Sequence, residues 1–343
     1  MKPVVWALVP LLSVAGVSMH ANSAAAQASL ANTSTRVTLA LPGAGENPYR
    51  GTRFDWSGVI SGLEFEGHTW FGQWFERMDP SIHDFIYGSS GIIAGPCTAV
   101  TGPVEEFTAA LGYQDAAVGG TFVKIGVGVL RKPSDAKYDS FHLYEIADPA
   151  QWHVSRRRNM VRFQQEIGDS SSGFGYEYSK TVRLSDREPM LIIDHQLKNT
   201  GKRAIETDVY DHNFLVIDRQ APGPDITIGV PFQIDAIHPP ESNLAEFTGD
   251  HIRFLRQLSG EDRVYGSFHG FGSSPSDYDI RIEDARIGGG LRITGDRPLS
   301  NAAVWAIRSV LAVEPFVNIA IEPGKTATWR YQYTFYKLES PSR

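Results

Sequence analysis

Apolar and polar residues alternate with a period of two along much of the chain. Examples are the segments 36–41, 121–130 and 190–197. A period of two places successive side chains on opposite faces of a strand, so these segments are predicted strands with one buried face. Helical periodicity is scarce and nowhere long, which predicts an all-β protein.

Clusters of turn-forming residues separate the predicted strands. They combine Gly and Pro with Asn, Asp and Ser, which favour tight turns. The clearest clusters are 133–135, 168–170, 199–201, 287–290 and 322–325.

Two of these turns lie between segments that the pattern predicts as antiparallel hairpins. The first joins 190–198 to 204–210, and the second joins 317–321 to 326–336. In the last segment Trp329, Tyr331, Tyr333 and Phe335 alternate along one face, which favours a place in the core over a platform for sugar rings.

The N-terminus has the pattern of a secretory signal. Lys2 precedes an apolar run from residue 4 to 17, and small residues ending in Ala-Gln-Ala follow. We expect residues 1–28 to be a signal peptide cleaved after Ala28, and the mature chain to be periplasmic or secreted without stable membrane insertion. A retained N-terminal anchor is the alternative.

No repeat, low-complexity linker or shift in composition divides the rest of the chain. We therefore predict a single domain over 29–343, a large antiparallel β-sandwich. The formal net charge of -7 argues against a nucleic-acid partner, which would favour a basic face. Cys97 is the only cysteine, so no intramolecular disulfide can form, and we expect a buried structural thiol there.

Two short stretches carry candidate chemistry. His212 lies in the sequence Tyr-Asp-His-Asn-Phe at the end of a predicted strand, and Glu314 interrupts an otherwise apolar strand. Burial raises the pKa of a carboxyl group that lacks a partner. A histidine and a carboxylate in one pocket supply the acid and the base that are needed to move protons on sugar oxygens.

The order of these motifs resembles the galactose mutarotase, or aldose 1-epimerase, superfamily. An Asn-Thr-Gly turn precedes Asp-His-Asn-Phe at 211–214, and a late Glu314-Pro315 precedes Pro-Gly-Lys at 323–325. The resemblance implies a galactose mutarotase-like sandwich in which Glu314 is the general base and His212 the general acid. The chain departs from the family at Asp211, where the family usually has asparagine.

Further residues are candidates for contact with a sugar. The segment 49–56 mixes aromatic and charged residues, as sugar sites do, and contributes Arg50, Arg53 and Asp55. Asp211 and the acidic loop residue Glu105 are two more candidates. For the family's second active-site histidine, His83 and His142 remain open alternatives.

Three functional hypotheses follow, all with a carbohydrate as the partner and none with a cofactor. The first is a mutarotase-like isomerase that uses His212 and Glu314. The second is a polysaccharide or glycoside lyase in which Arg50 or Arg53 neutralises a uronate carboxylate, and the expected export favours polysaccharide as substrate. The third is a noncatalytic carbohydrate-binding protein. No tight metal-ligand motif is present, although His83, Asp84, His212 and Glu314 leave a metal site open.

Overall fold

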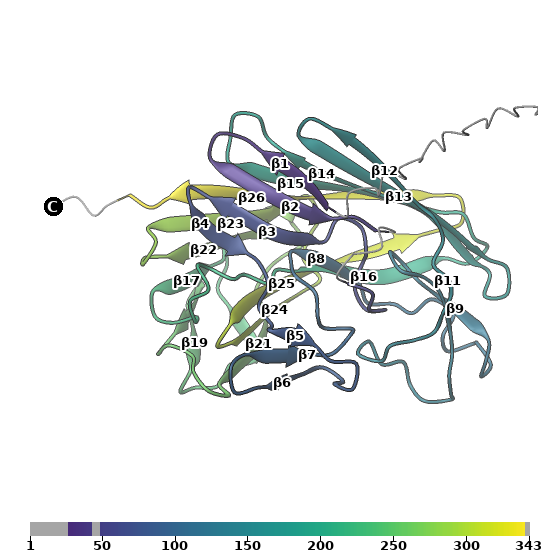
Figure 1. The fold of residues 1–343 in the computed structure, drawn as a ribbon, viewed down its shortest axis with the longest axis horizontal. Coiled ribbons are helices and arrows are strands. Elements are labelled where there is room, and N and C mark those ends of the chain that lie inside the picture. Colours follow the sequence, from purple (N-terminus) through teal and green to yellow (C-terminus); the bar gives the residue numbers. More distant parts are fainter. Residues whose placement is uncertain (1–26, 43–48, 340–343) are drawn as a thin grey trace, which may run out of the picture.

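Two layers of β-sheet stacked face to face dominate the computed structural model, which describes residues 27–42 and 49–339 (Figure 1). The first layer is a sheet of ten strands among the described residues. In spatial order they are β12 (Trp152–Arg157), β13 (Met160–Asp169), β14 (Phe174–Leu184), β15 (Met190–Asn199), β26 (Thr326–Lys337), β23 (Gly289–Gly295), β22 (Asp279–Asp284), β17 (Ile226–Gly229), β20 (His251–Phe254) and β19 (Ala245–Thr248).

The second layer combines a six-stranded and a four-stranded sheet of the described chain. The six strands in order are β18 (Asp235–His238), β21 (Arg263–His269), β24 (Asn301–Ile307), β25 (Val310–Ile321), β16 (Ile205–His212) and β8 (Val104–Phe107). The four are β1 (Gln27–Ala31), β2 (Thr35–Ala40), β3 (Ile60–Phe65) and β4 (His68–Phe71). Leu215 links the two sheets, because it forms isolated bridges with both Phe71 and Leu311.

Two small sheets and one short helical turn complete the described residues. The strands are β9 (Thr121–Lys124), β10 (Gly128–Arg131) and β11 (Ile146–Asp148) in one sheet, and β5 (Arg77–Met78), β6 (Phe85–Tyr87) and β7 (Ile92–Ala94) in the other. The 3-10 turn η1 spans Pro275–Asp277. All strand pairs of the described chain are antiparallel except β5 with β7, so the prediction of a large antiparallel β-sandwich is confirmed. None of the helical structure in the described chain has the length and apolar character needed to cross a membrane.

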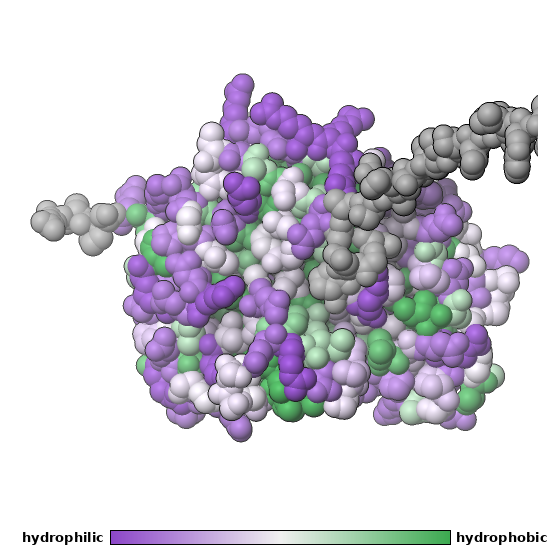
Figure 2. All heavy atoms as spheres, in the orientation of Figure 1, coloured by the Kyte–Doolittle hydropathy of each residue, from purple (hydrophilic) through white to green (hydrophobic). Residues whose placement is uncertain are grey.

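The main core lies between the two layers. Core-facing residues of β26 include Trp329, Tyr331, Tyr333 and Phe335, each at most 1% exposed, so the expectation that this aromatic row is core is confirmed. Burying one such side chain contributes about 1.5–3 kcal/mol to stability. On the face shown in Figure 2 hydrophilic side chains predominate, with hydrophobic residues scattered among them.

Both predicted hairpins are wrong. β15 and β16 follow each other in sequence but belong to different layers, and the same holds for β25 and β26. Both strands of each pair are apolar on the face that points into the core. The turn between them carries the chain from one layer to the other, so the two apolar faces pack on each other. The predicted strand 121–130 is likewise two strands, β9 and β10, separated by a turn in which Gly126 has a φ of 77°.

A second apolar cluster covers the outer face of the six-stranded sheet. Its largest members include Phe54, Trp74, Phe122, Phe214 and Trp305. Loops and the two small sheets supply much of this cover, so this face is enclosed instead of being open to water. The fold therefore provides a sheltered region outside the main core, and the candidate site lies there.

The expected export signal lies outside the described residues apart from its last two. Gln27 and Ala28 are the first residues of β1, where they pair with Ala40 and Leu39. Ala28 is 7% exposed and packs in the main core. Strand β1 of the described chain thus includes the last two residues of the predicted signal peptide.

Candidate active site

Strand register brings His212 and Glu314 together. β16 and β25 pair up to Tyr210 opposite Phe316, and the same register continued by two residues places His212 opposite Glu314. Directly opposed residues on one face of an antiparallel pair lie within reach of each other. Nε2 of His212 is 3.2 Å from Oε1 of Glu314.

Burial controls the ionisation of this pair. Removal from water raises the pKa of Glu314 from 4.5 to about 7, and the neighbouring Arg53 only partly opposes this. Removal from water, together with Arg53, also lowers the pKa of His212 well below its ordinary value. Nδ1 of His212 is buried without a hydrogen-bond partner among the described residues, a position that disfavours the doubly protonated ring. Below about pH 7 the pair therefore holds one proton to share, and this proton belongs to the pair as a unit.

Aromatic rings hold the imidazole in place. The ring of Phe214 stacks on His212 at a centroid distance of 3.6 Å and an interplanar angle of 10°. Phe54 and Trp305 meet the same ring edge-on at 5.7 and 6.0 Å. These contacts fix the direction in which Nε2 points, which is toward Glu314 and the pocket.

The pair lines a pocket of about 160 Å³. Its walls combine aromatic rings with charged and hydroxyl groups, a mixture that suits a sugar ring with its hydroxyls. The lining residues are Arg53, Asp84, Phe85, Thr98, Phe141, His212, Phe214, Arg263, Tyr265, Trp305 and Glu314.

Arg53 is anchored by a buried carboxylate and a phenol. Its Nε donates to Oε2 of Glu106 at 2.6 Å, and Nη2 donates to the hydroxyl of Tyr210 at 3.0 Å. Tyr210 in turn donates to the same Glu106 oxygen at 2.6 Å. The guanidinium group also lies 4.5 Å from the ring centroid of Phe141, another wall of the pocket. Of the three candidates in the segment 49–56, Arg53 is therefore the one that lines the pocket.

Asp55, Glu105 and Asp211 do not reach this pocket. Each is completely buried between the two layers, because strand alternation points Glu105 and Asp211 away from the face that carries Glu106 and His212. We expected these three carboxylates to contact a sugar, but they lie in the interior of the sandwich and not in the pocket.

An ionic network holds these interior carboxylates. Lys180 donates to Glu105, and Nε2 of His195 lies 2.8 Å from the other oxygen of Glu105. Against the effect of burial, Lys180 and His195 lower the pKa of Glu105 to about 2. Burial raises the pKa of Asp55 to about 7 and that of Asp211 well above its ordinary value. Glu105 is therefore the one carboxylate beside Lys180 that is firmly ionised at neutral pH.

Three other predicted residues lie outside the pocket. Arg50 lies over the ring of Trp56 at 5.2 Å. His83 is exposed and pairs with Asp139 at 2.6 Å. The ring of His142 packs edge-on against Tyr144, while its carbonyl accepts hydrogen bonds from Thr52 and the buried thiol of Cys97. Neither histidine lies beside His212, and within the described part of the chain the pocket lining includes no second histidine.

Sequence reasoning missed several lining residues. Arg263 brings charge to the pocket, and Phe141 and Trp305 bring aromatic walls, while Asp84 had been named only for a metal site. Asp84 follows the candidate His83, and Glu106 follows the candidate Glu105. A period-two pattern over 104–107 places Glu105 and Glu106 on opposite faces of one strand, but only the tertiary contacts decide which face meets the pocket.

No group of three or more His, Cys, Asp or Glu side chains within 27–42 and 49–339 is placed to hold a metal ion. The alternative metal site of His83, Asp84, His212 and Glu314 is therefore not assembled in this part of the chain. His83 is engaged with Asp139, and Asp84 accepts a hydrogen bond from the Thr98 hydroxyl at 2.9 Å.

The fold has counterparts among solved structures. The Slr1438 protein of Synechocystis sp. PCC 6803 is 13% identical over 91% of this chain and 96% of its own, with a TM-score of 0.51. A putative aldose 1-epimerase from Escherichia coli K12 is 12% identical over 91% and 99% of the two chains, with a TM-score of 0.50. A galactose mutarotase related enzyme from Lactobacillus acidophilus is 10% identical over 92% and 100%, with a TM-score of 0.51. No protein-family model and no curated protein matches the sequence, so these similarities establish the fold alone.

Proposed function

We propose that this chain, which has the galactose mutarotase-like fold, is an exported enzyme that interconverts the anomers of a sugar at His212 and Glu314. The observation that carries the proposal is the 3.2 Å contact between the two side chains in a small pocket with aromatic walls. Export to the periplasm or the medium is the part that rests on the N-terminal sequence, and N-terminal sequencing of the mature protein tests it.

The proposed reaction needs one acid and one base. A proton leaves the anomeric hydroxyl while another reaches the ring oxygen, so the C–O bond of the ring opens to an aldehyde. Rotation about the neighbouring carbon–carbon bond and the reverse proton transfers then close the ring as the other anomer. A pair that shares one proton supplies both roles, because whichever of Glu314 and His212 holds the proton is the acid and the other is the base.

Arg53 supports this chemistry from the pocket wall. Its charge favours the ionised form of Glu314 and disfavours the protonated form of His212. Both effects lower the affinity of the pair for its shared proton, so the pair gives that proton up more readily to the sugar. Because Glu106 and Tyr210 hold the guanidinium group in place, this influence is fixed before the sugar binds.

The test follows the anomers directly. A freshly dissolved pure anomer of each aldose in a panel is mixed with the mature protein, and the return to equilibrium is followed by polarimetry or by NMR exchange. The proposal expects acceleration over buffer with at least one sugar, and a loss of about 10²–10⁴-fold with Glu314→Gln or His212→Asn. Full activity in both variants would exclude this pair as the acid and base.

A second candidate function is elimination from a uronate-containing glycan. Arg53 and Arg263 both line the pocket and could neutralise a uronate carboxylate while a base removes the adjacent proton. The absorbance of a new unsaturated uronate product measures this activity. Sugar binding with neither anomer exchange nor elimination would instead identify a noncatalytic carbohydrate-binding protein.

A further inference from the structure

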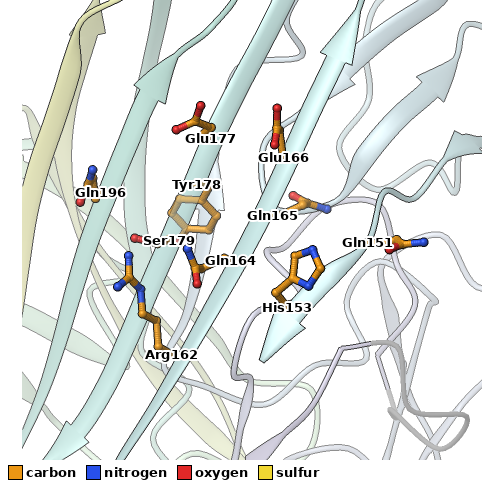
Figure 3. A pocket seen from close by; sticks show the side chains of 10 residues that line it. All are labelled: Gln151, His153, Arg162, Gln164, Gln165, Glu166, Glu177, Tyr178, Ser179 and Gln196. Atoms are coloured by element: carbon orange, nitrogen blue, oxygen red, sulfur yellow. The ribbon is translucent and has the colours of Figure 1, made fainter. Parts of the chain in front are cut away.

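A polar trough crosses the outer face of the ten-stranded sheet, on the layer opposite the His212–Glu314 pair. Two adjoining hollows, of about 330 and 350 Å³, share the residues Arg162, Ser179 and Gln196. Figure 3 shows the first hollow, with side chains contributed by successive strands of the sheet. Together the hollows extend across β12, β13, β14, β15 and β26.

The middle of the trough is a single row of residues in direct register. His153 pairs with Gln164, Gln164 with Ser179, Ser179 with Gln196, and Gln196 with Thr328. Directly opposed residues in neighbouring strands point to the same face. The row therefore offers one hydrogen-bonding side chain from each of five strands, two of them amides and two of them hydroxyls.

Charged side chains flank this row, and several of them neutralise one another. On one side Glu177 pairs with Lys198 at 3.0 Å. On the other side Asp194 pairs with Arg330 at 2.5 Å and with Arg183 at 3.0 Å. These ion pairs neutralise charge within the protein, whereas Arg162 and Glu166 also line the trough and form no ion pair among the described residues. The amides and hydroxyls of the central row are the uncharged groups that can receive a ligand.

Apolar surface contributes little to the trough. Tyr178 and Trp329 border it but face the core, at 2% and 1% exposure. A stable protein partner would require a desolvated apolar centre, which this lining lacks. A nucleic acid would require a concentrated positive charge, whereas the lining carries four carboxylates (Glu166, Glu177, Asp194 and Asp296) and two arginines (Arg162 and Arg330).

The spacing of the row fits a chain of sugars. Neighbouring strands of a sheet lie about 5 Å apart, which is close to the length of one sugar residue in an extended polysaccharide. Amides both donate and accept hydrogen bonds, as sugar hydroxyls do. A polysaccharide lying across the strands would thus place one residue over each side chain of the row.

We propose that this trough is a noncatalytic binding site for a linear, uncharged polysaccharide. It holds the polymer on the layer opposite the pocket and does not depend on any activity of His212 and Glu314. Hydrogen bonds at the five positions supply the recognition, and the exposed fractions of Gln164 and Gln196 allow their substitution without loss of the fold.

Affinity electrophoresis in gels containing a dissolved polymer tests the proposal with the full mature chain. The polymers are glucomannan, arabinoxylan, hydroxyethyl cellulose and the anionic polygalacturonate. We expect retardation by at least one uncharged polymer and an apparent dissociation constant at least tenfold higher for the double variant Gln164→Ala/Gln196→Ala. Gln332→Ala is the matched control, because Gln332 lies on the same face of β26 outside the trough lining.

The outcomes separate this site from the proposed active site. Unchanged binding by the double variant, equal loss in the Gln332 control, or a preference for polygalacturonate would each overturn the proposal. So would the absence of retardation by every uncharged polymer. Anomer exchange by the double variant should equal that of the wild type, whereas Glu314→Gln should lose exchange and keep polymer binding.

Discussion

Replacement of Glu314 by Gln should stabilise the protein at alkaline pH while removing its proposed activity. Glu314 is buried beside a neutral imidazole, and its pKa in the folded protein is about 7, against an ordinary value of 4.5. The difference of about 2.5 pKa units corresponds to about 3 kcal/mol. A raised carboxyl pKa means that the folded state favours the protonated form, so stability is lost as the pH rises from 4.5 to 7.

Glutamine keeps the shape and hydrogen-bonding capacity of the neutral acid but never ionises. Urea unfolding of the wild type and Glu314→Gln at several pH values between 4 and 8.5 therefore measures the cost of the buried charge. We expect nearly equal free energies of unfolding at pH 4 and a gain of up to about 3 kcal/mol for the variant above pH 7. Glu322→Gln, at an exposed turn, is the control. A difference that does not change with pH would refute the assignment of a buried, uncompensated carboxyl at 314.

Three further predictions concern the interior network, the pocket and its proton. Lys180→Met should lower the free energy of unfolding by about 3–5 kcal/mol in urea, because the substitution leaves buried carboxylates without their cation. Lys198→Met, at a partly exposed ion pair, is the control and should cost under about 1 kcal/mol. Gly102→Ala should reduce anomer exchange, because a Cβ there would lie 2.5 Å from the carbonyl oxygen of His212. Gly62→Ala, with nothing within 4 Å of the added Cβ, should leave the rate unchanged. The rate of anomer exchange should fall as the pH rises through about 7, the pKa of Glu314, because the pair then loses its shared proton. A rate that stays constant above pH 7 would contradict this.

Period-two patterning predicted most strands but could not assign them to layers. The segments 190–198 and 204–210 have the pattern and the turn of a hairpin, yet β15 and β16 lie in opposite sheets. Local sequence specifies that a turn occurs, whereas the choice between pairing along an edge and crossing the core depends on what other strands bury. Strand β26, for example, takes the place beside β15 that the predicted hairpin gave to β16.

The same limit applied to the candidate site. His212 could be selected from the sequence because it lies at the end of a predicted strand, and Glu314 because it interrupts an apolar strand. Arg53 could be selected because it lies in a segment that mixes charge with aromatic residues. Asp55 and Glu105 have the same local character, but the fold directs them into the interior network around Lys180.

By itself the sequence determined the class of fold, since the alternation of apolar residues requires strands with one buried face, and it determined which residue types carry proton chemistry. Only the tertiary structure decided which strands are neighbours, that the register of β16 and β25 joins His212 to Glu314, and that five polar residues form one row across the outer sheet. Such contacts join residues far apart in the chain. Their energies depend on the desolvation and packing of the assembled layers, which no local pattern contains.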